Sequence, residues 1–274
     1  MKTIHHYTVA GDQAGVTVEA YLKEVLNYSG RKLQKLTRQK GITVNNKPAY
    51  LQRILKAQDR LGVLADKDAG YGVDPEPGQV EILYEDDYLA VLNKPAGLLV
   101  HPAGRTTSGT LANYLAYEWQ QRGILSTIRP VHRLDRDTSG CIIFAKDSRS
   151  QSLLEQQLKT RQLTRRYCAL ANGFVTPPAG TIDAPIGAHP TLSNRRSITP
   201  LGEPAVTRYE VIREFTNASL LELVLDTGRT HQIRLHLAHI GHPVIGDRKY
   251  GQNSALMKRQ ALHAQSVRFL HLGS

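Results

Sequence analysis

The sequence predicts an α+β protein with a mixed, mostly antiparallel sheet, preceded by a smaller α/β module. In most of the 274-residue chain, apolar runs of strand length follow one another without regularly spaced helices, which argues against a doubly wound parallel sheet. The beginning of the chain instead has two helical patterns followed by short strands. An acidic stretch with glycine and proline, DKDAGYGVDPEPG, separates the two parts. We therefore expect domains at residues 1–66 and 80–274, joined by a linker at 67–79.

The net charge of +11 is unevenly distributed along the chain. Residues 1–66 carry +6, residues 67–97 carry −5 and residues 98–274 carry +10. Such an excess of basic side chains indicates a polyanionic partner. Two cysteines without a CxxC spacing argue against a disulfide scaffold and a thiolate zinc site, and fit a reducing, cytoplasmic location. The sequence has no signal-peptide pattern and no run of 18 apolar residues, so we expect neither export nor membrane insertion.

The smaller module should begin with an amphipathic helix, because apolar residues recur at i, i+3, i+4, i+7 and i+8: Val18, Tyr21, Leu22, Val25 and Leu26. Ser29 can cap a second helix over residues 30–40, in which Leu33 and Leu36 face inward. Gly41 suits the left-handed position that ends that helix. The following ITVNNKPAY predicts a strand, an asparagine turn and a second strand, and LGVLA predicts a third.

The second helix is basic, and its candidate RNA-binding residues are Arg31, Lys32, Lys35 and Arg38. Its charge has one sign, which favours a phosphate-binding surface over a merely solvated face. The order of elements and the segment KGITVNNKPAYLQRILKAQDRLGVL resemble the S4 RNA-binding domain, with matches at Gly41 to Lys47 and Asp59 to Val63. The resemblance implies binding to structured RNA and names no reaction.

In the larger domain, apolar patterns predict strands that are not regularly separated by helices. The strands are expected at Val80–Tyr84, Leu89–Leu92, Cys141–Ala145, Tyr167–Ala171, Thr207–Val211 and Leu220–Leu225, and the helices near Leu111–Trp119, Arg149–Leu158 and His231–Ile240.

The segment VHRLDRDTSG, Val131 to Gly140, places two carboxylates, two guanidinium groups and an imidazole directly before an apolar strand. Polar groups on a loop held by a strand are typical of active sites, although spacing alone equally fits an ion-paired turn. Asp135 also begins a D-x-D-x-(T/S) pattern found in phosphatases that form an aspartyl-phosphate. The preceding IRPVHRL is a poor buried strand, and no acidic pair follows to hold Mg²⁺, which disfavours a phosphatase.

HRLDRDTSG resembles the HRLDxxTSG signature of the RluA-type pseudouridine synthases. Three further segments resemble motifs of that family in the same order: NKPAGLLVHP, then RRYCALANG, then TGRTHQIRLHLAHIGHPVIGDRKYG. The resemblance implies a pseudouridine synthase fold that converts uridine to pseudouridine in structured RNA. In that reaction the C1′–N1 bond breaks, the uracil rotates and a C1′–C5 bond forms, without a metal or other cofactor. Family sequences commonly continue past VRFLHLGS, so the C-terminus of this chain is expected to be short.

By the same resemblance, Asp135 is the nucleophile, by attack at C1′ or by assisting glycal formation, and Arg234 is its cationic neighbour. Tyr167 is expected to stack on the uracil and to transfer a proton. Arg133 is the candidate to brace the gap left by the flipped nucleotide. The remaining candidate RNA-binding residues are His132, Lys94, Arg229, His231 and Gln232.

We expect a monomer whose partner is ribosomal RNA, with transfer RNA as the other possible target. The main alternative is a non-catalytic RNA-binding or ribosome-assembly factor with the same fold. The cluster of His231, His236, His239 and His242 suggests a metal site only weakly, because no carboxylate or cysteine lies within the cluster.

Overall fold

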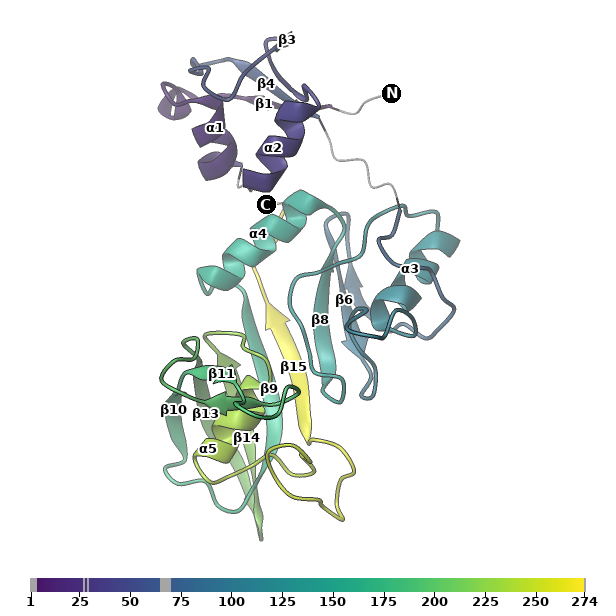
Figure 1. Ribbon diagram of the computed structural model, residues 1–274, viewed down its shortest axis with the longest axis vertical. Coiled ribbons are helices and arrows are strands. Elements are labelled where there is room, and N and C mark those ends of the chain that lie inside the picture. Colours follow the sequence, from purple (N-terminus) through teal and green to yellow (C-terminus); the bar gives the residue numbers. More distant parts are fainter. Residues whose placement is uncertain (1–3, 27, 29, 65–69, 274) are drawn as a thin grey trace. The chain divides into compact units, whose positions relative to one another are not determined.

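The computed structural model describes residues 4–26, 28, 30–64 and 70–273. The chain divides into two compact units, Met1–Ala69 and Gly70–Ser274, which are described separately. Figure 1 labels their helices and strands. The predicted helix cap at Ser29 lies outside the described residues. In the part of the chain that the structure describes, no helix is both long and apolar enough to span a membrane.

The small unit contains a four-stranded antiparallel sheet with the order β1-β4-β2-β3. Its strands are β1 (Ile4–Thr8), β2 (Ile42–Val44), β3 (Lys47–Pro48) and β4 (Arg60–Leu64). Asn45 and Asn46 both have positive φ and form the tight turn between β2 and β3, as the sequence predicts. The first strand, β1, is not predicted by the sequence, because IHHYT has no clear alternation of apolar and polar residues.

The first predicted helix of the small unit is broken into two parts. A short 3₁₀ turn at Gly11–Gln13 is followed by α1 (Val18–Ala20), which Thr17 caps, and by a π-helical turn at Tyr21–Val25. The wider π turn shifts the helix face, so that Val25 is 38% exposed while the other four apolar residues of the pattern are buried.

The second helix, α2 (Gly30–Arg38), buries Leu33 and Leu36 as predicted. The left-handed residue after it is Lys40, with φ of 49°, so the prediction for Gly41 is wrong. Glycine is required at position 41 for space, because a Cβ atom there would lie 2.8 Å from Cβ of Leu64.

The large unit is built on one sheet with the order β10-β13-β14-β9-β15-β8-β6-β5, with β7 also paired to β8. All pairs are antiparallel except β15 with β8, which confirms the predicted α+β class. The strands are β5 (Ile82–Glu85), β6 (Leu89–Lys94), β7 (Arg129–Pro130), β8 (Ser139–Ala145), β9 (Thr164–Asn172), β10 (Ala179–Asp183), β13 (Val206–Phe215), β14 (Ala218–Leu225) and β15 (Leu262–Arg268).

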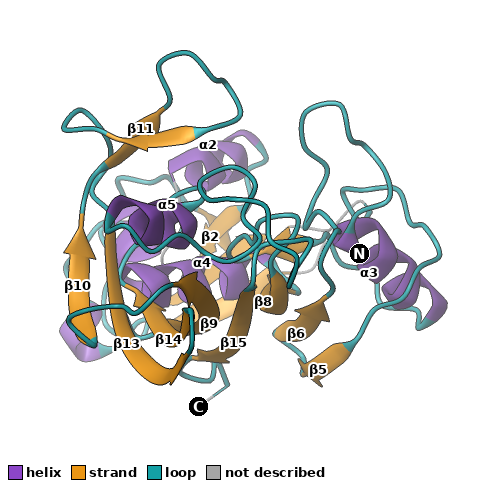
Figure 2. Cartoon of the chain, turned by 90° about the horizontal axis from the view of Figure 1, so that it is seen from below, coloured by secondary structure: helices purple, strands orange, loops and turns teal. Residues whose placement is uncertain are grey.

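Three helices cover the two faces of this sheet (Figure 2). They are α3 (Leu111–Gln121), α4 (Ser148–Lys159) and α5 (Gln232–His239). Alternate residues of β6 and β8 face opposite sides, so that one core cluster includes α3 and α5 and another includes Leu154 of α4. Thr110 and Asp147 cap α3 and α4.

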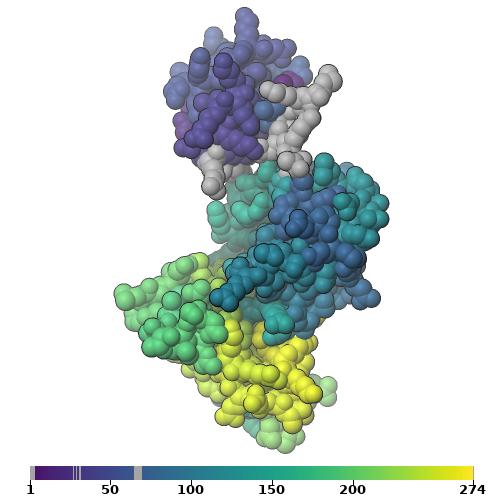
Figure 3. All heavy atoms as spheres, turned by 45° about the vertical axis from the view of Figure 1, so that its right-hand side comes forward, coloured from purple at the N-terminus to yellow at the C-terminus, as the bar shows by residue number. Residues whose placement is uncertain are grey.

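A small hairpin formed by β11 (Ile186–Ala188) and β12 (Arg196–Ile198) lies beside α5 (Figure 2). In Figure 3 the hairpin belongs to the green region of the surface, which lies next to the yellow C-terminal segment. Two hydrogen bonds join them: Nζ of Lys249 donates to the carbonyl of Asn194, and the Arg196 N–H donates to the hydroxyl of Tyr250.

The strand β15 joins the two halves of the large sheet. Ala264 is the register partner of Gly140 on β8 and of Tyr167 on β9. The loop that precedes β8 is therefore held two strands away from Tyr167, roughly 10 Å by sheet geometry. Gly140 has φ of 111°, and a Cβ atom there would lie 2.1 Å from the Ala264 carbonyl oxygen. Only glycine permits this close approach.

Candidate active site

The segment predicted to be catalytic is an ordered loop between β7 and β8. The Thr138 N–H donates to the carbonyl of Asp135 at 3.1 Å, which closes a turn. The buried Thr138 hydroxyl accepts a hydrogen bond from Gln260 at 2.9 Å. On the other side, the carbonyl of Arg136 accepts the N–H of Gly97 at 3.0 Å. The side chain of Asp135, 23% exposed, thus projects from a loop that is fixed on both sides.

Arg234 of α5 lies against this loop and forms ion pairs with two carboxylates. Its Nη1 donates to Oδ2 of Asp135 at 2.8 Å. Its Nε and Nη2 donate to the two oxygens of Asp247 at 2.6 and 2.7 Å. This bidentate pair fixes the plane of the guanidinium group, so that Nη1 is directed at Asp135. The predicted pairing of Asp135 with Arg234 is therefore present, and a second carboxylate orients it.

Burial disfavours the charged forms of Asp247 and Arg234, but their mutual attraction is stronger. Asp247 is fully buried, and burial alone would raise the pKa of its carboxyl group; the hydrogen bonds and charge of Arg234 outweigh that effect and lower the pKa. For Arg234, burial is likewise outweighed by the hydrogen bonds to Asp247 and by the charges of both carboxylates, which raise its pKa. Arg234 is thus a permanent cation in the site.

Asp247 is not among the residues that the sequence predicts for the site. It follows Gly246, which has φ of 75°, in the segment GDRKYG. Besides Arg234, its Oδ1 accepts the backbone N–H groups of Lys249 and Tyr250. Asp247 does lie within the segment TGRTHQIRLHLAHIGHPVIGDRKYG that resembles a family motif, but its carboxylate is indistinguishable from that of a turn residue before the fold is known.

Tyr167 on β9 is 4% exposed and faces the same side of the sheet as the Asp135 loop. Burial raises the pKa of its hydroxyl, and the charge of Asp135 raises it further, while Arg165 opposes the shift. No hydrogen bond of this hydroxyl is found among the described residues, so a substrate group can take that place. A tyrosine at this position can offer a ring face to a base and a proton donor that stays neutral at pH 7.

Three residues predicted to meet RNA are buried structural residues instead. Lys94 is fully buried, and its Nζ donates to the carbonyls of Pro95, Leu98 and Arg136 at 2.8, 2.7 and 2.8 Å. Burial lowers the pKa of Lys94 to about 8, partly offset by the charges of Asp137 and Asp135. The ammonium group therefore anchors the loop that carries Asp135, because all three of its protons are already donated to backbone oxygens.

Gln232 and His132 also direct their polar atoms into the protein. The amide of Gln232 makes four hydrogen bonds, which tie α5 to β13 and to the loop at Thr227. Nε2 of His132 accepts the Ile143 N–H at 3.3 Å, and its ring is 7% exposed. Burial lowers the pKa of His132 to about 3, so the ring is neutral. The Gln232 amide is thus hydrogen-bonded within the protein, whereas Nδ1 of His132 is buried without a partner among the described residues.

Three other candidates lie at the surface near the site. Arg133 is exposed two residues before Asp135, and it has no ion pair within the described part of the chain. Arg229 is exposed and paired with Glu203. His231 is half-buried, with Nδ1 2.8 Å from the hydroxyl of Tyr250, and burial lowers its pKa to about 4. His231 can therefore donate a hydrogen bond to RNA, but it is not a cation at pH 7.

The four RNA-binding candidates of the small unit are on α2. Lys35 and Arg38 are exposed. Lys32 is half-buried, with Nζ 4.2 Å from the centre of the Tyr28 ring. The side chain of Arg31 lies outside the described residues. The exposed positive charges of α2 are consistent with a surface that binds phosphates.

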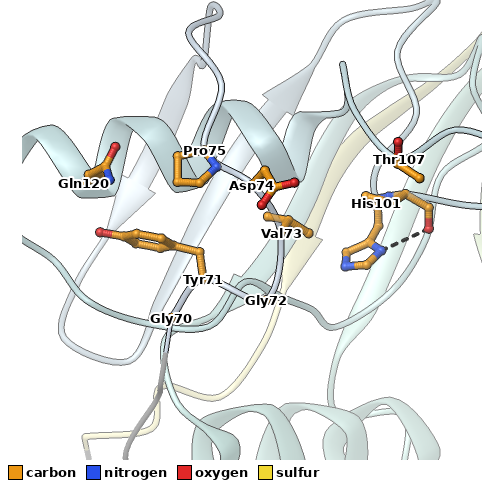
Figure 4. A pocket seen from close by; sticks show the side chains of 10 residues that line it. Gly70, Tyr71, Gly72, Val73, Asp74, Pro75, His101, Thr107 and Gln120 are labelled. Atoms are coloured by element: carbon orange, nitrogen blue, oxygen red, sulfur yellow. Dashed lines mark hydrogen bonds between the residues drawn. The ribbon is translucent and has the colours of Figure 1, made fainter.

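A shallow groove of about 560 Å³ lies elsewhere in the large unit (Figure 4). Tyr71 and Gln120 lie on one side of it, and His101 and Thr107 on the other. Neither Asp135 nor Arg234 lines this groove, so we do not assign it to the chemistry. Among the described residues, no three histidine, cysteine or acidic side chains come together as a metal site would require, and this includes the histidines around α5.

Comparisons with known proteins identify the family of this chain. Residues 88–239 match the RNA pseudouridylate synthase family, and residues 5–61 match the N-terminal domain of the RluD ribosomal pseudouridine synthase. An uncharacterized RNA pseudouridine synthase, YhcT of Bacillus subtilis, is 42% identical over 264 residues, which are 94% of this chain and 86% of that protein. The ribosomal large subunit pseudouridine synthase D of Nitrosomonas europaea is 37% identical over 277 residues, covering 96% and 80% of the two chains.

Solved structures show the same fold. The human RNA pseudouridylate synthase domain containing 1 superposes with a TM-score of 0.61 at 28% identity, over 73% of this chain and 83% of that one. The fold and the family match together define a pseudouridine synthase. The chain belongs to the RNA pseudouridylate synthase family, within its RluA type, and is an RNA pseudouridine synthase.

Proposed function

We propose that this enzyme isomerises uridines of large-subunit ribosomal RNA, with Asp135 as the nucleophile and without a cofactor. The observation that supports the catalytic assignment is that Arg234 forms ion pairs with both Asp135 and the buried Asp247. The ribosomal target is supported by the names of the relatives that the chain matches over nearly its whole length. Transfer RNA is the competing target.

Each residue of the proposed site has a separate role. Asp135 acts at C1′ while the C1′–N1 bond breaks, by direct attack or by assisting glycal formation. Arg234 compensates the negative charge beside the sugar through its 2.8 Å hydrogen bond. Tyr167 stacks on the detached uracil while it turns, and its neutral hydroxyl takes part in proton transfer at C5. Arg133 braces the helix from which the nucleotide is flipped. The small unit holds structured RNA through α2, in the manner of an S4 domain.

The test uses the purified protein and unmodified transcripts of large-subunit ribosomal RNA and of transfer RNAs. Pseudouridine is mapped by carbodiimide labelling and primer extension. The wild type should modify defined uridines of the ribosomal transcript. Asp135→Asn should lose at least about a thousand-fold in single-turnover rate while its RNA dissociation constant stays within about twofold. Conversion by Asp135→Asn would contradict the assigned nucleophile, and a product found only in transfer RNA would contradict the target. An inactive wild type would favour an RNA-binding assembly factor.

A further inference from the structure

Arg165 is a buried cation on the catalytic side of the sheet. Alternate residues of β9 face the same side, so Arg165 lies on the face that carries Tyr167. Arg165 is 9% exposed, whereas its neighbour Arg166 is exposed on the other face and pairs with Glu222. The two adjacent arginines therefore have the same chemistry and opposite surroundings.

The guanidinium group of Arg165 is poorly satisfied by the protein. Its Nη2 donates to the carbonyl of Thr227 at 3.3 Å. Its Nε is buried without any hydrogen-bond partner, and no carboxylate pairs with Arg165 among the described residues. A Cβ atom on Gly228 would lie 3.0 Å from Nη1 of Arg165, so the absence of a side chain at position 228 leaves room for this group.

Arg165 is also close to both loops that form the catalytic centre. Thr227 and Gly228 belong to the loop that leads into α5 and Arg234. The pKa of His132, three residues before Asp135, is lowered first by burial and then by the charge of Arg165. The guanidinium group, which has no ion pair among the described residues, therefore lies against the loop that leads to Arg234, and its charge also acts on Tyr167 and His132.

A buried cation without a counter-charge lowers the free energy of unfolding, and buried donors are normally hydrogen-bonded. An anionic oxygen of a bound substrate would remove both penalties. The proposed reaction supplies one, because the electron pair of the broken C1′–N1 bond stays with the uracil and spreads onto its oxygens. This holds whether C1′ then bonds to Asp135 or a glycal forms by loss of the C2′ proton. The phosphate of the same nucleotide is the other source of an anionic oxygen.

We propose that Arg165 binds an anionic oxygen of the target nucleotide through its unpartnered Nε. This inference rests on the proposed function and adds a binding residue to that site. Arg165 donates a hydrogen bond and transfers no proton. The source of the oxygen, the detached uracil or the phosphate, is distinguished by the kinetic step that depends on Arg165.

The experiment compares Arg165→Gln with Arg166→Gln, a matched control on the opposite face of the same strand. Single-turnover rates at saturating RNA and RNA dissociation constants are measured for both. If the oxygen is on the uracil, Arg165→Gln should lose on the order of a hundred-fold in rate with unchanged affinity. If it is on the phosphate, affinity should fall about tenfold, and RNA with a neutral methylphosphonate at that phosphate should bind wild type and variant equally. Arg165→Lys should recover part of the loss in either case.

A rate and an affinity for Arg165→Gln within twofold of those of Arg166→Gln would overturn the proposal. Gly228→Ala provides a second test that keeps the charge, because its Cβ atom would lie 3.0 Å from Nη1 of Arg165 and the guanidinium group must shift by a few tenths of an ångström. It should reduce the same quantity as Arg165→Gln, the rate or the affinity, by a smaller factor. If neither is reduced, the result counts against the proposal even where Arg165→Gln fails to fold. Absence of pseudouridine with the wild type would instead contradict the proposed function, and the binding measurements would still test the phosphate contact.

Discussion

The substitution Asp247→Asn tests whether the buried carboxylate of Asp247 orients Arg234. Asn keeps the shape of Asp and can accept one of the two hydrogen bonds from Arg234, but it removes the charge that compensates a nearly buried guanidinium group. Breaking a buried pair by removing one partner costs about 3–5 kcal/mol. Because Asn retains one acceptor and Asp135 still pairs with Nη1, we expect a loss at the lower end, about 3 kcal/mol of unfolding free energy.

The fluorescence of Trp119 is a suitable signal for this measurement, because it is the only tryptophan and is fully buried in the large unit. Guanidinium-induced unfolding at pH 7 then reports on that unit alone. Glu222→Gln is the control, since its partner Arg166 is exposed and the loss should stay below about 1 kcal/mol. The rate of Asp247→Asn should also fall on the order of a hundred-fold, because a guanidinium group that is no longer clamped is misplaced relative to Asp135.

The stability and the rate of Asp247→Asn together decide the outcome of this comparison. An Asp247→Asn protein that unfolds within about 1 kcal/mol of the wild type and keeps its rate would refute an orienting role for Asp247. Normal stability with a reduced rate would keep the orienting role and refute the stability estimate.

The pKa of Asp247 is lowered in the folded state. Its contribution to the free energy of unfolding is therefore present above the unfolded pKa and is lost as the pH falls through the folded pKa.

Two further predictions concern His132 and the small unit. The pKa of His132 is lowered to about 3, so the unfolded chain binds a proton below about pH 6.5 that the folded chain does not; this should remove about 2 kcal/mol of stability between pH 7 and pH 5. His132→Asn should therefore show a smaller loss over the same interval in Trp119-monitored unfolding, and an equal loss would mean that another group titrates. The double variant Lys35→Gln, Arg38→Gln should weaken RNA binding and reduce the slope of log affinity against log salt by roughly 1–2, with the saturated rate unchanged. An unchanged slope would exclude these residues from the RNA-binding surface.

Local patterns in the sequence predict much of the fold because they report on burial and turn chemistry. The helices near residues 111–119 and 149–158 and the strands at 141–145 and 167–171 are confirmed to within a few residues. The strand β15 is not predicted, although it lies in the middle of the sheet. In its sequence LHAQSVR, apolar and polar residues alternate only weakly. Its place in the sheet is held by backbone pairing with β9 on one side and β8 on the other.

The residue motifs alone indicated the family and predicted that Asp135 pairs with Arg234, because these residues lie in long and specific segments; the comparisons confirm the family and the structure contains the pair. The tertiary structure decided which of the candidate polar side chains are buried and hydrogen-bonded within the protein. Lys94, Gln232 and His132 carry the same donors and acceptors whether they meet RNA or the backbone, and only the fold shows that the backbone takes them. Asp247 and Arg165 acquire their roles through contacts across the chain, Asp247 with Arg234 and Arg165 with the loop at Thr227. Burial and pairing are properties of the packed chain, and sequence spacing does not encode them.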